Sequence, residues 1–185
     1  MAKTIALFGH RRLWGKDIRE RLTNVIKTEI EKYDEVNFLI GNHGDFDSLA
    51  LSVCRELRKS YPQIKITVVF TSLHIMVKHK DELFTTLDLY KDVQTMMYEI
   101  EEEHYKNQIV VSNRRMVDDS DLIICYVDMN EYRSGAKRAI KYAVKQNKPI
   151  INIFREQDKP FYGMTSEEID KEWEKIKRKL DKSQA

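Results

Sequence analysis

Short apolar runs alternate with amphipathic stretches along most of this 185-residue chain. The runs at 3–8, 36–40 and 64–70 are compact and rich in branched side chains, which is typical of buried strands. The stretches 16–33 and 47–61 repeat apolar residues every three or four positions, which indicates helices. This order of strand, helix, strand, helix and strand predicts a parallel sheet with right-handed crossovers.

The alternation continues in the second half of the chain. The pattern is looser over 71–106, where we expect a loop followed by a helix. Further elements are expected as a helix over 108–118, a strand over 121–127, a helix over 136–146 and a strand over 150–154. The pattern as a whole predicts an α/β fold in which helices flank a mostly parallel five-stranded sheet.

A charged helix over 166–181 is expected to end the chain. Thr165 or Ser166 is a suitable cap for it, with Glu168 in capping-box register. Nothing in the composition requires a second domain, so we predict a single domain over residues 1–185.

Composition narrows the classes of function. The formal net charge is +2, from 32 Lys and Arg against 30 Asp and Glu, and the basic residues are dispersed among the acidic ones. This balance gives no support to nucleic-acid binding. No apolar run approaches the roughly 20 residues that span a bilayer, and no signal-peptide pattern is present, so we expect a cytoplasmic protein without a membrane partner. Cys54 and Cys125 lie among apolar residues and are expected to be reduced core residues.

Glycines stand where predicted strands give way to helices. Gly9 follows the first strand, Gly41 and Gly44 follow the second, and Gly135 precedes the helix over 136–146. Each could be a simple turn or cap glycine. Because the carboxyl ends of parallel strands meet at one edge, where helix N-termini favour anions, the four together predict a site for a phosphate-bearing small molecule.

Two arginine pairs are candidates for phosphate binding. Arg11 and Arg12 directly follow the first strand, and Arg114 and Arg115 lie in the helix over 108–118. A guanidinium can bind a phosphate through two hydrogen bonds, although a solvated surface position is the alternative. We expect one arginine of each pair to face solvent.

The other polar residues of the glycine turns could each bind a ligand or have a structural role. His10 and His43 could bind a ribose or a phosphate, or could order their own turns. Asp45 and Asp47 could bind a ribose hydroxyl or cap the second helix, and capping is favoured for Asp47. Ser134 could donate to a phosphate at the start of a helix. His74 and His79 are five residues apart and lack the spacing of a helical zinc site, so we predict neither a metal nor a cofactor.

A longer pattern resembles the SLOG superfamily, which includes the Lonely Guy phosphoribohydrolases and the Smf/DprA proteins, and it is most similar to the small bacterial or phage type. The resemblance is carried by segments 8–11, 41–47, 113–124, 134–135, 139–143 and 148–151. It implies a Rossmann-like three-layer sandwich whose carboxyl edge binds a nucleotide or nucleotide-derived ligand. The ligand-binding or phosphate-binding residues expected there are Gly9, His10, Arg11, Arg12, Gly41, Asn42, His43, Gly44, Asp45, Asn113, Arg114, Arg115, Ser134 and Gly135.

The chain departs from the phosphoribohydrolases at their PGGxGTxxE motif. The corresponding stretch 132–139 has one glycine, and Ala139 stands where the motif glutamate would fall. A methyl group can neither act as a general base nor stabilise a ribosyl cation. A replacement carboxylate could come from Glu99 or Glu103, expected on one face of a helix, or from Asp128 at the end of the fourth strand.

Two classes of function therefore stay open. The first is a sensing or sequestering module that binds a nucleotide-derived ligand. The second is an enzyme that cleaves or transfers at an N-glycosidic bond. A DNA-handling role like that of the Smf/DprA branch is disfavoured by the modest net charge.

The resemblance also implies a homo-oligomer, because SLOG proteins commonly pair. The amphipathic segment 83–97 offers an apolar surface for such pairing, formed by Leu83, Leu87, Tyr90 and Met97. The alternative is that these side chains cover the chain's own sheet.

Overall fold

A computed structural model describes residues 1–71, 88–100, 105–131 and 134–182. The chain divides into two compact units. The first comprises Met1–Leu13 and Asp17–Phe154, and the second comprises Trp14–Lys16 and Arg155–Ala185.

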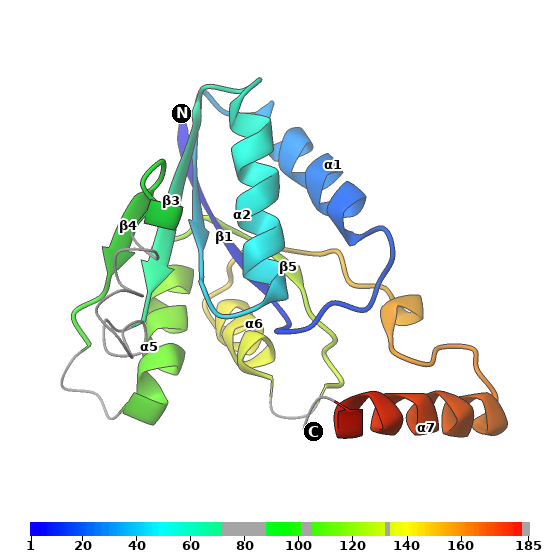
Figure 1. Cartoon of the computed structure of the whole chain (residues 1–185). Helices are drawn as coiled ribbons and strands as arrows, with labels where there is room; N and C mark the ends of the chain where they lie inside the picture. Colours follow the sequence, from blue (N-terminus) through cyan, green and yellow to red (C-terminus); the bar gives the residue numbers. More distant parts are fainter. Residues whose placement is uncertain (72–87, 101–104, 132–133, 183–185) are drawn as a thin grey trace. The chain divides into compact units, whose positions relative to one another are not determined.

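Six strands of the described residues form one sheet in the first unit, and all its paired strands run parallel (Figure 1). The spatial order is β4-β3-β2-β1-β5-β6. The strands are β1 (Ala2–Gly9), β2 (Glu35–Ile40), β3 (Ile64–Phe70), β4 (Gln94–Met97), β5 (Leu122–Tyr126) and β6 (Ile150–Asn152).

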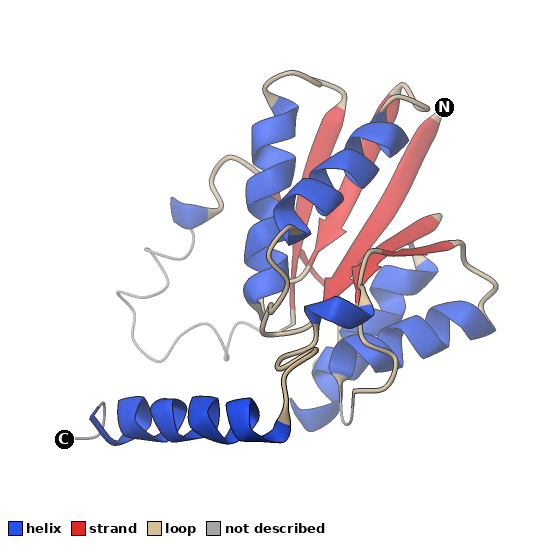
Figure 2. Ribbon diagram, turned by 90° about the vertical axis from the view of Figure 1, so that its right-hand side faces the viewer, coloured by secondary structure: helices blue, strands red, loops and turns tan. Residues whose placement is uncertain are grey.

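Helices cover both faces of this sheet (Figure 2). Alternate side chains of β1 define the two faces, because Ile5 and Leu7 belong to one core cluster and Ala6 and Phe8 to the other. The first cluster also holds the apolar sides of α1 (Ile18–Ile30) and α2 (Asp45–Arg58), and the second holds those of α5 (Tyr105–Asp118) and α6 (Gly135–Lys145). The predicted α/β fold, a three-layer sandwich of the Rossmann type, is confirmed.

The number of strands differs from the prediction of five. The additional strand is β4, which pairs with β3 from Thr67↔Gln94 to Phe70↔Met97. Its side chains at Gln94 and Thr95 are exposed, as befits an edge strand, so it lacks the continuous apolar run that marks the central strands.

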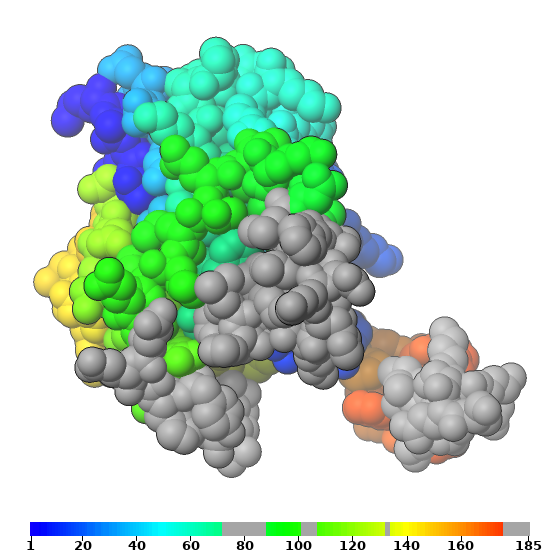
Figure 3. All heavy atoms as spheres, turned by 60° about the vertical axis from the view of Figure 1, so that its left-hand side comes forward, coloured from blue at the N-terminus to red at the C-terminus, as the bar shows by residue number. Residues whose placement is uncertain are grey.

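Two arginines hold the turn that leads into β4 against α2. Both Arg55 and Arg58 bind the carboxylate of Asp92, and Arg58 also donates to the Asp92 carbonyl at 2.9 Å. Figure 3 shows the segment 88–100, in green, lying beside the cyan residues of α2. Tyr90 of this turn contacts Phe70 edge-on, with ring centroids 5.2 Å apart.

The strand order reverses between β1 and β5. The chain builds β1 to β4 outward in one direction and then returns to place β5 on the other side of β1. Connections leave the carboxyl ends of β1 and β5 in opposite directions, so a crevice opens there. This is the edge at which the glycine turns were expected to meet.

The second unit contains a short 3₁₀ helix, η1 (Glu156–Asp158), and the long helix α7 (Ser166–Lys182). The backbone N–H of Thr165 donates to Glu168 at 2.8 Å, and the Glu168 N–H donates to the Thr165 hydroxyl at 3.4 Å. This is the predicted capping box, with Thr165 as the cap. Trp173 is 49% exposed and lies 5.7 Å from the ring of Phe161.

Two further expectations concern the chain as a whole. Cys54 and Cys125 are buried and form no disulfide, which confirms them as core residues. Among the described ranges, no helix combines the length and apolar character that crossing a membrane would require.

Candidate functional site

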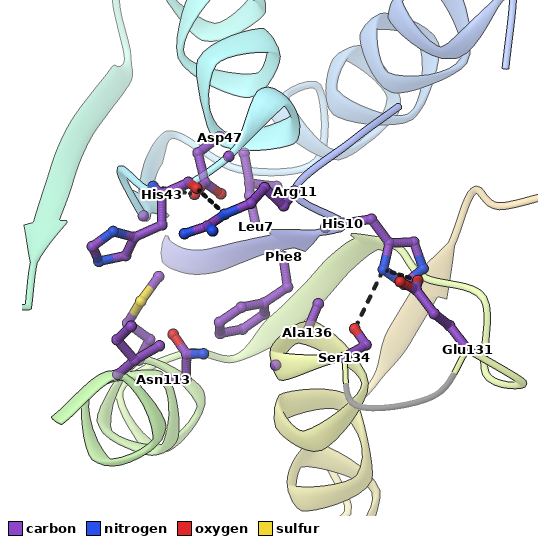
Figure 4. A pocket seen from close by; sticks show the side chains of 16 residues that line it. Leu7, Phe8, His10, Arg11, His43, Asp47, Asn113, Glu131, Ser134 and Ala136 are labelled. Carbon is purple, nitrogen blue, oxygen red and sulfur yellow. Dashed lines mark hydrogen bonds and ion pairs between the residues drawn. The ribbon is translucent and has the colours of Figure 1, made fainter. Parts of the chain in front are cut away.

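A cavity of about 350 Å³ lies at the carboxyl edge of the sheet, beside the point where the strand order reverses (Figure 4). Its walls come from the end of β1, the β2–α2 turn, α5 and the β5–α6 loop. It is lined by Leu7, Phe8, Gly9, His10, Arg11, Gly41, His43, Gly44, Asp47, Ile109, Asn113, Met116, Glu131, Ser134, Gly135 and Ala136. Most of the sequence-predicted residues therefore come together in one place.

Some predicted residues do not line this cavity. Arg12 and Asp45 are exposed, and Asn42 lines a separate hollow beside α2. Arg114 and Arg115 are also exposed, and the Arg114 guanidinium lies 5.4 Å from the centroid of the Tyr142 ring. All four arginines are exposed, and of the four only Arg11 lines the cavity, so the expected division into one inward and one outward arginine does not describe either pair.

Arg11 is the cation at the β2–α2 side of the cavity. Its Nε donates to the carbonyl of His43 at 3.2 Å, and its own carbonyl accepts the N–H of Asp45 at 2.9 Å. His43 is fixed by a 2.6 Å hydrogen bond between Nε2 and the hydroxyl of Thr71. Burial, followed by the charge of Arg11, lowers the pKa of His43, so this ring is neutral at pH 7 and Arg11 supplies the positive charge.

Asp47 organises the β2–α2 turn from inside the first turn of α2. The N-cap of this helix is Gly44, and the carboxylate of Asp47 reaches back to accept the N–H of His43 at 2.8 Å. Burial raises the pKa of Asp47 to about 6, against the lowering effect of hydrogen bonds from the His43 and Gly44 backbone. Asp47 was expected to cap this helix, but the N-cap is Gly44 and the Asp47 carboxylate instead holds the turn that precedes the helix. The same side chain lines the cavity.

His10 joins β1 to the β5–α6 loop. Its Nε2 lies 2.6 Å from the backbone N–H of Asp128, which can only donate, so Nε2 is an acceptor and the ring proton is on Nδ1. Nδ1 lies 2.6 Å from a carboxylate oxygen of Glu131 and 3.3 Å from the hydroxyl of Ser134. Burial lowers the pKa of His10, against the opposing charges of Glu131 and Asp128, which agrees with a neutral ring.

None of the three carboxylates considered as replacements for the motif glutamate is among the described residues that line the cavity. Asp128 does not line the cavity, and its Oδ1 accepts the N–H of Asn130 at 2.8 Å. Glu99 is exposed and lies in a bend after β4, so its expected helical position is wrong. Glu103 lies outside the described residues.

The glycines that line the cavity are glycine for different physical reasons. A Cβ on Gly9 would lie 2.1 Å from Cγ of Phe46, and one on Gly44 would lie 2.8 Å from the Cα of Arg11. Both positions are therefore fixed by close packing within the protein. A Cβ on Gly135 would meet no atom of the described residues within 4 Å. Internal packing does not account for this glycine.

The N-terminus of α6 opens onto the cavity. Ser134 is its N-cap and accepts the N–H of Lys137 at 3.1 Å. Within the described part of the chain, the N–H groups of Gly135 and Ala136 have no acceptor. The first amides of a helix carry a partial positive charge, so this end of the cavity is suited to an anion.

Sequence reasoning missed the rest of the lining. Leu7, Phe8, Ile109, Met116 and Ala136 form its apolar part, and they carry no chemical signal in the sequence because buried apolar residues are common everywhere. Glu131 lies in a polar loop without periodicity, three residues after the candidate Asp128. It contacts His10, which lies far away in the sequence.

No group of His, Cys, Asp and Glu side chains suited to a metal ion occurs in the ranges that the structure describes. His74 and His79 lie outside those ranges.

Residues 2–157 match the model of the YspA SLOG family, and this range includes every residue that lines the cavity. A comparison with curated proteins found no match.

Proposed function

Because the chain belongs to the YspA SLOG family, we propose that it binds a nucleotide or nucleotide-derived small molecule at the carboxyl edge of its parallel sheet, as a sensing or sequestering module. One observation carries this proposal. The N-terminus of α6, where the amides of Gly135 and Ala136 have no acceptor among the described residues, borders a cavity of about 350 Å³ that is also lined by Arg11.

The chemistry of the lining suits such a ligand. Helix amides and a guanidinium together bind phosphate well. Phe8, Ile109 and Met116 provide an apolar surface against which a base can pack. The volume is at the lower end of the roughly 300–1,000 Å³ typical of small-molecule sites, which favours a ligand of mononucleotide size.

Ala139 supports binding rather than glycosidic cleavage. This residue replaces the motif glutamate, is 3% exposed and packs in the core between the sheet and α6. The position is therefore part of the hydrophobic interior and does not supply polar chemistry to the cavity.

Calorimetric titration with the four ribonucleoside 5′-monophosphates tests the proposal. We expect binding to the wild type and a loss of about tenfold or more in Gly135→Val, because the added side chain fills the space next to the helix amides. Lys145→Val is the matched control, since it places the same side chain on an exposed position at the other end of α6. Equal affinities in Gly135→Val and Lys145→Val would contradict the proposed phosphate position.

Cleavage or transfer at an N-glycosidic bond is the second candidate function. The observation that favours it is the carboxylate of Glu131, which lies in the cavity beside His10. Release of free base from a nucleoside monophosphate by the wild type, and its loss in Glu131→Gln, would establish this activity. Intact nucleotide after prolonged incubation would leave binding as the function.

We also propose a homo-oligomer, on the basis of the SLOG resemblance. Of the four side chains considered for pairing, Leu83 and Leu87 lie outside the described residues. Tyr90 packs on Phe70 and so covers the chain's own sheet, and Met97 is half-buried in β4. Light scattering coupled to gel filtration will give the assembled mass.

A further inference from the structure

Glu131 is a cavity residue that belongs to no sequence motif. It lies in the β5–α6 loop, and one oxygen of its carboxylate is 2.6 Å from Nδ1 of His10 (Figure 4). The side chain is 48% exposed, so water or a ligand can reach its remaining acceptor positions. The backbone of the same residue is held by two bonds, from its N–H to the Asp128 carbonyl at 3.2 Å and from Lys137 Nζ to its own carbonyl at 3.0 Å.

The hydrogen bonds of His10 determine what Glu131 can recognise. Nε2 accepts the Asp128 N–H, so Nδ1 carries the ring proton and donates it to the Glu131 carboxylate. This donation orients the carboxylate and uses one of its acceptor positions. An ionised carboxylate has no donor, so any ligand group that binds the remaining positions must itself donate a hydrogen bond.

The position of Glu131 relative to the helix N-terminus limits the ligand further. Nδ1 of His10 is also 3.3 Å from the hydroxyl of Ser134, the N-cap of α6. The acceptor carboxylate and the N-cap of α6 therefore both lie next to the same nitrogen of one imidazole ring. A ligand that uses both must present a donor group close to a negatively charged group.

Resting on the function proposed above, we infer that Glu131 binds the ribose hydroxyls of the nucleotide and selects ligands in which those hydroxyls are free. Ribose hydroxyls are donors that lie near the 5′-phosphate of the same nucleotide. A deoxyribose lacks one of these donors, and a 2′- or 3′-phosphate brings further negative charge against the carboxylate. His10 is a positioning residue in this arrangement.

Calorimetric titration of a matched ligand series tests the inference. The series is the tightest-binding ribonucleoside 5′-monophosphate with its 2′-deoxy, 3′-deoxy and 3′-phosphorylated derivatives. For the wild type we expect at least one deoxy analogue to bind about tenfold more weakly, because it lacks a hydroxyl that donates to the charged carboxylate. The 3′-phosphorylated derivative should be rejected at least as strongly.

Two variants assign the selectivity to Glu131. Glu131→Ala should bind the ribose and deoxyribose ligands with similar affinity, and Glu131→Gln should recover affinity for the 3′-phosphorylated derivative because the repelling charge is gone. Glu99→Gln is the matched control, since Glu99 is exposed and does not line the cavity. It should keep the wild-type selectivity.

The outcomes separate this inference from the proposed function. Binding of ribose and deoxyribose ligands by the wild type within about twofold of each other would overturn the role of Glu131 and leave nucleotide binding in place. Unchanged selectivity in Glu131→Ala would do the same. Absence of binding of all four monophosphates to the wild type would contradict the proposed function and the inference together.

Discussion

The turns that lead into α2 and α6 have the same sequence character, a strand followed by a glycine and a helix, but they differ in where their backbone hydrogen bonds go. At α2, the carboxylate of Asp47 and the carbonyl of Arg11 accept the N–H groups of the turn. At α6, the amides of Gly135 and Ala136 have no acceptor among the described residues. The first helical amide of α2, that of Asp45, is therefore bonded within the protein, whereas the first helical amide of α6, that of Gly135, has no acceptor in the part of the chain that the structure describes.

The two turns also differ in why they contain glycine. Gly44 is required by the close approach of the Arg11 backbone, whereas nothing in the described structure approaches Gly135. Of these two glycines, Gly44 is therefore explained by packing within the protein, and Gly135 is the one that packing leaves unexplained.

The largest expected effect is the loss of stability in Gly9→Ala. The new Cβ would overlap Phe46 of α2 at the position where β1 ends, and a clash in a packed core costs about 1–3 kcal/mol or more. Urea unfolding of Gly9→Ala should show a reduced free energy of unfolding. Gly44→Ala should also lose stability, because its new Cβ would lie 2.8 Å from the Cα of Arg11, and a backbone atom cannot move aside easily.

A pH-dependent loss of stability is expected from Asp47, whose pKa rises from an ordinary 3.8 to about 6 on folding. The folded state binds the proton more tightly, so the contribution of Asp47 to stability is greatest at low pH and falls as pH rises from about 4 to about 6. About two pKa units correspond to roughly 3 kcal/mol at most.

Urea unfolding between pH 4 and pH 7 will measure this effect as the difference between the wild type and Asp47→Asn, which keeps the shape and one acceptor oxygen. Taking the difference between the two proteins removes the contribution of carboxylates such as Asp92, whose lowered pKa makes stability change with pH in the opposite direction. A difference that does not change with pH would contradict the assigned titration of Asp47.

The smallest effect on stability is expected for Gly135→Ala. There is room for the methyl group, and replacing glycine by alanine in a helix contributes about 0.5–1 kcal/mol of stability. Unfolding by urea should therefore show an unchanged or slightly increased stability, in contrast with Gly9→Ala. A large loss would mean that Gly135 has a structural role like that of Gly44.

Much of the fold could be predicted because alternation of apolar runs is a local signal. The strands at the centre of the sheet carry continuous apolar sequences, and the helices between them have clear apolar faces. β4 was missed because an edge strand with exposed Gln94 and Thr95 lacks that signal. The same error placed Glu99 on a helix.

The candidate site was predictable in position but only partly in composition. The glycine turns do meet at one sheet edge, since strand direction follows from the alternation. The exposed positions of Arg114 and Arg115 could have been found from helical spacing, because Asn113 and Met116 share the inward face of α5 and the residues between them point elsewhere. The pairing of His10 with Glu131 could not have been found from the sequence, because it joins residues far apart in the chain.

The most direct test of the central claim is an amide-resolved NMR titration of the ¹⁵N-labelled protein with the tightest-binding nucleoside monophosphate. The account predicts that the Gly135 and Ala136 amides shift most, while those of His43 and Gly44, already bonded to Asp47, shift less. Shifts centred on the α2 turn, or none at either turn, would contradict it.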